Sequence, residues 1–182
     1  MRQLTEREWA SLFNRCRTAA WHLELRDVYG ADDEGEHFAR FLATGMRDEE
    51  AEAAGRRMWL SLMRSTTGRG VQVRRARIVS EPVTDYVRFE HAGTSLNAAA
   101  GEEVRWLPRA GASGIALPGN DFWLFDFETA IFNHFSGDGS SLGQEVSTDP
   151  WAVRLCRSAF EAVWAQAIPH ALYAPAGNSK AR

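Results

Sequence analysis

The stretch VQVRRARIVS, residues 71–80, alternates apolar and polar side chains between the glycine-rich GRG and Pro82. β-Branched residues in an alternating pattern between turn residues predict a β-strand. Successive side chains of a strand point to opposite faces, so Arg75 and Arg77 share a face with three valines, and Arg74 lies on the other face. This strand is the clearest in the chain, and its charged face is the most unusual polar feature.

Two arginines on a buried strand face need charged partners, because an unpaired buried guanidinium is very costly. The acidic residues expected to supply these partners are Asp85, Glu90, Asp121 and Asp126. Two interpretations follow. We favour an internal salt-bridge network, and the alternative is a ligand site built on the same arginines.

Upstream of this strand, the sequence predicts three helices and one further strand. Thr5 and Glu8 form a capping box that begins the first helix, and WHLELRDVY, residues 21–29, has the pattern of a strand. Further helices are predicted over residues 34–43 and 48–66. The second of these has acids in its first turn and arginines later, which suits the helix dipole.

Downstream, Pro82 begins a helical stretch, and EEVRWLPR, residues 102–109, predicts a strand followed by a flexible AGASG linker. The aromatic segment after it predicts a hairpin with strands over 121–126 and 130–135. Asp149-Pro150 then begins the last helix, which carries one apolar face.

This order of elements predicts an α/β fold, a single layered domain with a mixed sheet flanked by helices. We expect the domain to span residues 1–173 and the C-terminal tail, residues 174–182, to be flexible.

Charge is distributed unevenly in a chain whose net charge is only −3. Residues 56–109 hold ten Arg and five acids, whereas residues 1–55 hold seven Arg and twelve acids. A basic centre beside an acidic end suits either a phosphate ligand or internal pairing. Cys16 and Cys156 are far apart and form no metal-binding or disulfide pattern, so no cofactor or metal is expected. The charged start lacks a signal-like apolar stretch, so we expect a cytoplasmic protein that does not enter the membrane.

The short motifs of the sequence are weak. GSSLG, residues 139–143, has the letters of a nucleophile elbow with Ser141 as nucleophile, but no helix follows directly, so a loop is expected. His22 and Glu24 share one strand face and are expected to form a structural hydrogen bond. His134 and Asp138 could form a general base and its orienting group, although a surface histidine is the better prediction.

The blocks RRARIVSEPVTDYVRFEH, NAAAGEEVRWLPR and NDFWLFD resemble an actinobacterial family of a domain of unknown function. The similarity covers nearly the whole chain, from the FNRC…WHLELRDVY start to the AFEAVWAQAIPH end. Members of that family are often encoded beside small helix-turn-helix regulators. The resemblance therefore implies a regulatory partner protein rather than a metabolic enzyme.

A second resemblance is to one half of the phospholipase D-like superfamily. Residues 69–74 resemble its R-G-V-x-V-R strand, and residues 100–105 resemble the strand before its catalytic H-x-K-x-x-x-x-D segment. Aligning that segment with PGNDFWLFD places Asp126 on the motif aspartate, Gly119 on the histidine and Asp121 on the lysine. The nucleophile and the cation that steadies the phosphoryl oxygens are then absent, which implies a non-catalytic relative. A homodimer is expected only by analogy with half-size members of that superfamily.

We therefore expect a non-catalytic regulatory or interaction protein that works with a helix-turn-helix regulator or senses a small anion. The alternative is a hydrolase or phosphodiesterase-like enzyme with an arginine clamp and Glu90, Asp126 or His134 as acid–base group. A third hypothesis, nucleic-acid binding with aromatic stacking platforms, is the weakest because the chain is acidic overall. The candidate binding residues are Arg75, Arg77, Arg88, Glu90, Arg105, Trp106, Asp121, Trp123 and Asp126.

Overall fold

The computed structural model describes residues 1–30 and 35–176. A sheet of seven strands forms its centre, in the order β6-β5-β4-β1-β2-β3-β7. The strands are β1 Ala19–Glu24, β2 Gln72–Val79, β3 Glu103–Pro108, β4 Asp121–Phe125, β5 Thr129–Phe135, β6 Ser141–Ser147 and β7 Ile168–Pro169. The helices are α1 Glu6–Arg15, α2 Gly35–Thr44, α3 Glu49–Gly55, α4 Arg57–Gly68, α5 Asp85–Ala99 and α6 Pro150–Gln166, with short 3-10 helices η2 Arg109–Ala112 and η3 His170–Leu172.

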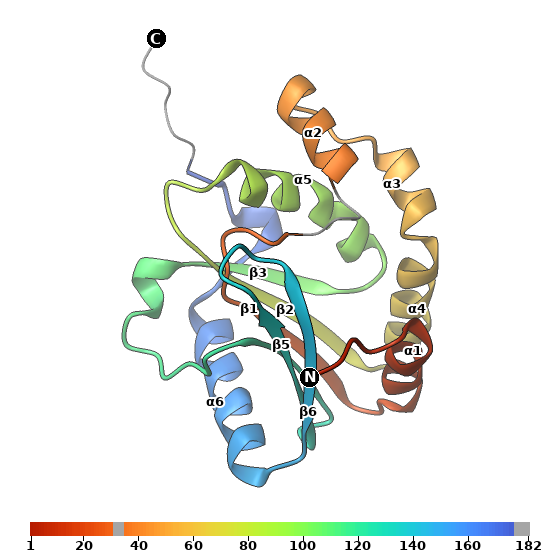
Figure 1. Ribbon diagram of the computed structural model, residues 1–182, viewed down its shortest axis with the longest axis vertical. Helices are drawn as coiled ribbons and strands as arrows, with labels where there is room; N and C mark the ends of the chain where they lie inside the picture. Colours follow the sequence, from red (N-terminus) through yellow and green to blue (C-terminus); the bar gives the residue numbers. More distant parts are fainter. Residues whose placement is uncertain (31–34, 177–182) are drawn as a thin grey trace.

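The three central strands β1, β2 and β3 are parallel, and β4, β5, β6 and β7 are antiparallel to their neighbours. The connection from β1 to β2 carries α2, α3 and α4, and the connection from β2 to β3 carries α5. Right-handed crossovers that advance in one direction place their helices on the same face of a sheet. These helices accordingly share one face with α1, and α6 covers the other (Figure 1).

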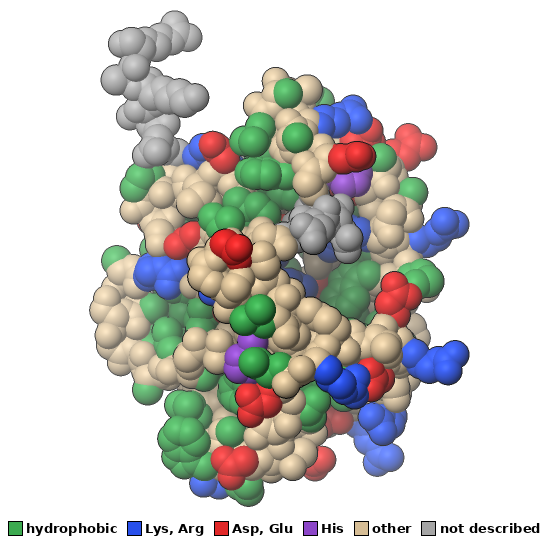
Figure 2. All heavy atoms as spheres, viewed as in Figure 1, with side chains coloured by type: hydrophobic (Ala, Val, Ile, Leu, Met, Phe, Trp, Pro, Cys, Tyr) green, Lys and Arg blue, Asp and Glu red, His purple; other side chains and the backbone are tan. Residues whose placement is uncertain are grey.

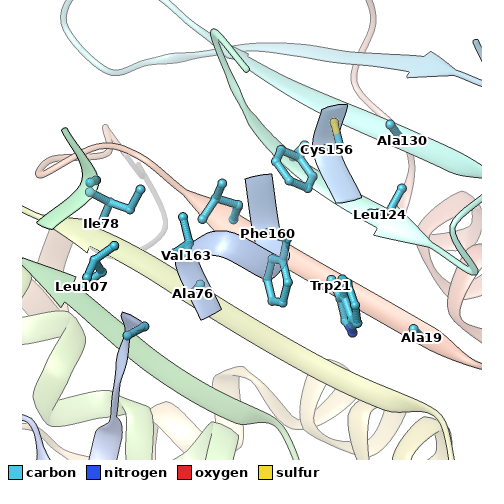
Figure 3. Close-up of a cluster of buried hydrophobic side chains, with 14 of the residues drawn as sticks. Ala19, Trp21, Ala76, Ile78, Leu107, Leu124, Ala130, Cys156, Phe160 and Val163 are labelled. Atoms are coloured by element: carbon cyan, nitrogen blue, oxygen red, sulfur yellow. The ribbon is translucent and has the colours of Figure 1, made fainter. Parts of the chain in front are cut away.

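Side-chain alternation divides the core between the two faces of the sheet. On the α6 face, Trp21, Ile78 and Leu124 pack against Phe160 and Val163 (Figure 3). On the opposite face, a second cluster forms beneath α1 and α4 and includes Phe13, Leu60, Met63, Val73 and Trp123. The mixed α/β fold that the sequence predicts is therefore confirmed.

The capping box and the face of the central strand are also as predicted. Thr5 accepts from the backbone N–H of Glu8, whose side chain in turn accepts from the Thr5 backbone N–H. Arg75 and Arg77 lie on the α5 face of the sheet, and Arg74 lies on the α6 face, over Trp164.

Several element boundaries differ from the prediction. The first strand ends at Glu24, because the chain turns away where Asp121 accepts from the backbone N–H of Leu25. The predicted helix over 48–66 is divided at Arg56 into α3 and α4. The helix expected from Pro82 begins at Asp85, where the Thr84 side chain caps it.

Two predicted loops are ordered elements. The segment predicted as a flexible AGASG linker contains most of η2. GSSLG leads into β6, and Ser141 is the first residue of that strand rather than part of a strand-to-helix turn. Of the predicted tail, residues 177–182 lie outside the described residues.

Candidate functional site

A buried ion-pair network lies on the α5 face of the sheet, with Glu24 at its centre. The Glu24 carboxylate contacts Arg75 Nη1 through Oε1 and lies 2.9 Å from Arg77 Nε through Oε2. Arg75 Nε donates to Glu102 Oε1 at 2.7 Å, and Arg77 Nη1 contacts Glu90 on α5. All five side chains are nearly inaccessible to solvent, so the two arginines and three carboxylates mainly neutralise one another.

The network keeps both arginines charged. Burial by itself lowers the pKa of Arg75 and Arg77, but the adjacent carboxylates outweigh burial and raise the pKa of each above its ordinary value. Of the four acids predicted as partners, Glu90 is the only one that pairs with either arginine in the described structure, and Glu24 and Glu102 take the remaining places.

The network reaches α4 through neutral groups. Asn97 on α5 donates to Glu102 and accepts from Arg56 Nη2 at 2.7 Å. Arg56 is the residue at which α3 ends and α4 begins. The kink between these helices is therefore connected through Asn97 to Glu102 and the ion-pair network.

His22 lies beside this network in a neutral state. Its ring stacks on Trp123 with centroids 4.3 Å apart and an interplanar angle of 13°. Burial, followed by the charges of Arg75 and Arg77, lowers the pKa of His22 well below its ordinary value. Nδ1 lies 3.3 Å from Glu24 Oε1, without the geometry of a hydrogen bond. The hydrogen bond expected between His22 and Glu24 is therefore not formed, although the two side chains lie next to each other.

Asp121 and Tyr29 form a second polar pair on the same face. Asp121 accepts from the Leu25 backbone N–H at 3.0 Å and from the Tyr29 hydroxyl. Burial is the main cause that raises the pKa of Asp121 to about 6, and the charge of Glu24 raises it further. Asp121 therefore holds its proton more tightly than an ordinary aspartate.

A large cleft opens on the same side of the molecule, between α1, α4 and α5. Its volume is about 980 Å³. Figure 2 shows a hollow to the right of centre, with hydrophobic side chains at its base and charged side chains around it. Four aromatic residues from four different elements line it: Trp9, Trp59, Phe89 and Trp123.

A smaller polar recess of about 100 Å³ lies beside the cleft. The two cavities share Arg47 and Arg56 as lining residues, and the recess also reaches Arg75, Arg77 and Glu90. The candidate site therefore combines an aromatic cleft with a small polar recess next to the ion-pair network.

Arg47 is held firmly where the two cavities meet. Its guanidinium forms a buried ion pair with Glu52, with Nη2 2.5 Å from Oε2, and lies 3.6 Å from the centre of the Phe89 ring. Nη1 donates to the Phe89 carbonyl at 2.5 Å. Gly93 makes room for this arrangement, because a Cβ there would lie 2.4 Å from the Arg47 guanidinium carbon.

The remaining predicted site residues lie elsewhere. Arg88 pairs with Asp85 in the first turn of α5. Arg105 points to the α6 face, where Nη1 donates to the Trp164 carbonyl at 3.0 Å and the guanidinium lies over the Trp164 ring. The structure therefore does not gather Arg75, Arg77, Arg88 and Arg105 into one clamp, because strand alternation and helix position separate them.

Asp126 has a structural position in the β4–β5 turn. Its carboxylate accepts from the backbone N–H groups of Arg17, Thr18 and Ala19 and from the Cys16 thiol. These hydrogen bonds lower the pKa of Asp126 despite the opposing effect of burial. Asp126 thus ties the turn to the start of β1 and pairs with neither of the central arginines.

Trp106 and Trp123, which the weakest hypothesis assigned as stacking platforms for nucleic acid, are both buried. Trp106 is fully buried, stacks on Tyr173 and donates from Nε1 to His170. Trp123 is 4% exposed, with its ring covered by His22 on one side. Neither indole presents a free face on which a base could stack.

His134 is remote from the candidate site. It lies on β5 and contacts Glu145 on β6 at 3.1 Å, while Asp138 bonds to Ser136 and the Ser140 backbone instead. The general base and orienting group predicted from His134 and Asp138 are not in contact in this arrangement.

Sequence reasoning missed Glu24 and Glu102 as partners and Trp9, Trp59 and Arg47 as cleft residues. Glu24 could have been found, because it shares a face with His22 on a strand adjacent to the arginines. The cleft could not, since its aromatic residues come from α1, α4, α5 and β4 and meet only in the folded chain.

Residues 1–30 and 35–176 contain neither a metal-binding group of side chains nor a helix that could span a membrane. In this part of the chain, no three or more His, Cys, Asp or Glu side chains are grouped so that they could hold a metal ion. None of the helices described is both long and apolar enough to cross a membrane.

The chain belongs to the family described as "Domain of unknown function (DUF6879)", whose family model matches residues 7–175. No curated protein matches the sequence.

Two solved structures resemble the chain weakly, each with a TM-score of 0.47. The first is Nuc, a phospholipase D family member from Salmonella typhimurium, with 11% identity over 88% of this chain and 86% of that chain. The second is TrmBL2, an archaeal chromatin protein that binds DNA, with 13% identity over 88% of this chain and 48% of that chain.

Proposed function

We propose that the protein is a non-catalytic sensor that binds a small anionic ligand in the aromatic cleft. The observation that carries the proposal is the cleft itself, about 980 Å³ in volume and lined by aromatic residues from four elements. Ligand sites are typically concave, largely apolar and roughly 300–1,000 Å³ in volume, with a small number of polar groups that orient the ligand.

The charge of the cleft lining favours an anion. Three arginines, Arg47, Arg56 and Arg57, line it together with two glutamates, Glu6 and Glu52. Arg47 and Glu52 neutralise each other as a buried pair. Counted together, the three arginines and two glutamates of the lining leave one positive charge, which favours an anion.

The state of the ionisable groups supports a binding role rather than catalysis. Arg75, Arg77 and Glu90 are engaged with one another and with Glu24 and Glu102, so a substrate would have to break existing ion pairs to contact them. The sequence also has Gly119 and Asp121 where the phospholipase D-like motif has its nucleophile and its lysine.

The alternative of a hydrolase finds less support. Its proposed acid–base groups are Glu90, Asp126 and His134, and they lie in three different environments. Robust phosphodiesterase activity of the purified protein, abolished by His134→Ala, would nevertheless overturn the non-catalytic proposal.

Ser61→Trp tests the cleft as a binding site. Ser61 is an exposed residue of α4 that lines the cleft, so an indole there would fill the space without disturbing the core. The matched control is Arg64→Trp, on the same helix but outside the cleft lining. Native mass spectrometry of protein exposed to an extract of small molecules should show a bound anion in wild type and control only.

Equal occupancy in all three proteins would show that the ligand binds elsewhere. Absence of any bound molecule in wild type, with the protein folded by circular dichroism, would contradict the sensor proposal.

We further propose that the ligand state is read by a protein partner. The family resemblance implies a helix-turn-helix regulator as that partner. Affinity capture with wild type, Ser61→Trp and Arg64→Trp as baits should recover a DNA-binding protein in amounts that change with Ser61→Trp alone. Recovery of the same amount by all three baits would show that the partner binds regardless of whether the cleft is filled, which would contradict this part of the proposal.

A further inference from the structure

We propose that the cleft ligand is a planar aromatic compound that carries one anionic group. This inference rests on the proposed function and specifies the chemical class that the cleft recognises. Its support comes from the arrangement of the aromatic rings, from the cations already placed against them and from the charge at the opening.

Three indoles form the apolar part of the cleft. The rings of Trp9 and Trp59 lie 6.3 and 6.1 Å from that of Trp123, at interplanar angles of 64° and 69°. Trp9 and Trp59 therefore each make an edge-to-face contact with Trp123. Flat rings in edge-to-face contact leave room for a further planar group to pack by stacking or by edge contact.

The inner part of this aromatic surface is rigid. Trp123 is 4% exposed and held by the stacked ring of His22 and by the edge of Phe13, whose centroid is 5.2 Å away. Trp9 and Trp59 are only half-buried, so they retain ring surface for a ligand. A preorganised surface loses little conformational entropy when a ligand binds, which favours a rigid planar partner.

The aromatic rings already hold cations of the protein itself. The Arg47 guanidinium lies 3.6 Å from the centre of Phe89, and that of Arg75 lies 5.7 Å from the centre of Trp123. Because arginines already lie over these two rings, a ligand cation could not take the same positions. The cleft is thus unlike an aromatic cage for ammonium groups, in which the ring faces are open to the ligand cation.

An anionic group would be favoured at the kink between α3 and α4. Arg57 lies there as an exposed lining residue at the first position of α4. A guanidinium attracts a carboxylate or a phosphate. The ligand would then place its ring against the indoles and its charge toward Arg57.

The experiment measures the binding of four small probes to the full chain by isothermal titration calorimetry. The probes are 2-naphthoate, 2-naphthylmethanol, 2-naphthylmethylammonium and octanoate, which separate the effects of charge and planarity. We expect 2-naphthoate to bind most tightly, and Ser61→Trp to abolish its binding while Arg64→Trp leaves it unchanged.

Arg57→Ala tests the position of the anionic group. We expect it to weaken 2-naphthoate about three- to fivefold, the usual range for a partly exposed charge contact, and to leave 2-naphthylmethanol unchanged. Arg64→Ala, an exposed arginine of the same helix outside the lining, is the control and should change neither.

Two outcomes would overturn the inference in different ways. If octanoate or the ammonium probe binds as tightly as 2-naphthoate and Ser61→Trp abolishes that binding, the ligand class is wrong and the cleft remains a ligand site. If 2-naphthoate fails to bind, or binds equally well to Ser61→Trp, the class inference fails. If the other three probes also fail to bind, or also bind equally well to Ser61→Trp, the proposal that the cleft is a ligand site fails as well.

Discussion

Glu24 is the residue on which the buried ion-pair network depends, because it contacts both Arg75 and Arg77. Replacing Glu24 removes one carboxylate partner from each arginine, while Arg75 keeps Glu102 and Arg77 keeps Glu90. The sequence supplied the two arginines and Glu90 but not this central carboxylate, since partner choice depends on strand order. Glu24 comes from β1, which becomes the neighbour of β2 only after a long crossover.

We predict that Glu24→Gln lowers the free energy of unfolding by about 1–3 kcal/mol, because buried guanidinium N–H groups lose an acceptor, as measured by urea denaturation. The matched control is Glu103→Gln, since Glu103 pairs with Arg74 but its side chain is 52% exposed. Solvent screens such a pair, so the control should change stability little. Equal effects of the two substitutions would show that the buried network contributes no more than a surface pair.

Asp121 gives the protein a specific dependence of stability on pH. Its pKa in the folded protein is raised from 3.8 to about 6, chiefly by burial. The folded state therefore binds the proton more tightly than the unfolded state. The resulting stability is fully present below the unfolded pKa and is lost as the pH rises through the folded one.

Asp121→Asn should remove this dependence. Relative to the variant, we expect wild type to lose about 1–2 kcal/mol of stability between about pH 4 and about pH 7. Urea denaturation of both proteins across this range measures the difference, in which contributions from other titrating groups cancel. A constant difference between the two proteins at every pH would show that Asp121 does not titrate there.

At the scale of elements, Arg47 and Arg56 both attach the α2–α3–α4 connection to α5, through the Phe89 carbonyl and Asn97. Phe38 and Phe41 of α2 add ring contacts to Phe89, but no described residue of α2 is fully buried. The fit of Arg47 depends on Gly93, at which a side chain would collide with the guanidinium.

We predict that Gly93→Ala destabilises the protein by about 1–3 kcal/mol, the usual cost of overpacking. Hydrogen exchange should increase over residues 35–55, because Arg47 must leave Glu52 and Phe89. Gly68→Ala is the control, since nothing lies within 4 Å of a Cβ at that position. If exchange in α2 and α3 is unchanged in Gly93→Ala, Arg47 does not anchor the connection.

The elements that the sequence predicted correctly are those with strong local signals. Thr5 with Glu8 sets the start of α1, and Asp149 with Pro150 sets the start of α6. β6 was missed because its glycine- and serine-rich sequence lacks a strand pattern. It is ordered by pairing with β5 and by Arg2, whose carbonyl accepts from the Gln144 backbone N–H.

At the scale of the whole molecule, one sheet supports two cores. The α6 face and the opposite face share β1, β2 and β4, whose side chains alternate between the two clusters. Loss of either cluster would expose the other side of the same strands. The overall α/β architecture followed from the sequence, whereas the cleft required the relative placement of helices that are far apart along the chain.

We therefore predict a single cooperative unfolding transition. Tryptophans lie in both clusters, including Trp21 on the α6 face and Trp123 on the other. Tryptophan fluorescence and far-ultraviolet circular dichroism should give coincident denaturation curves. Two separated transitions would show that the two faces of the sheet unfold independently.

The ion-pair network and the cleft wall are built from different parts of the chain, and this separation has an evolutionary consequence. The ion-pair network is fixed by strands β1 and β2 and by α5, whereas much of the cleft wall belongs to the segment between β1 and β2. Mutations in that segment can reshape the cavity without disturbing strand register. The architecture would thus let a lineage acquire new chemical preferences while its scaffold stays the same.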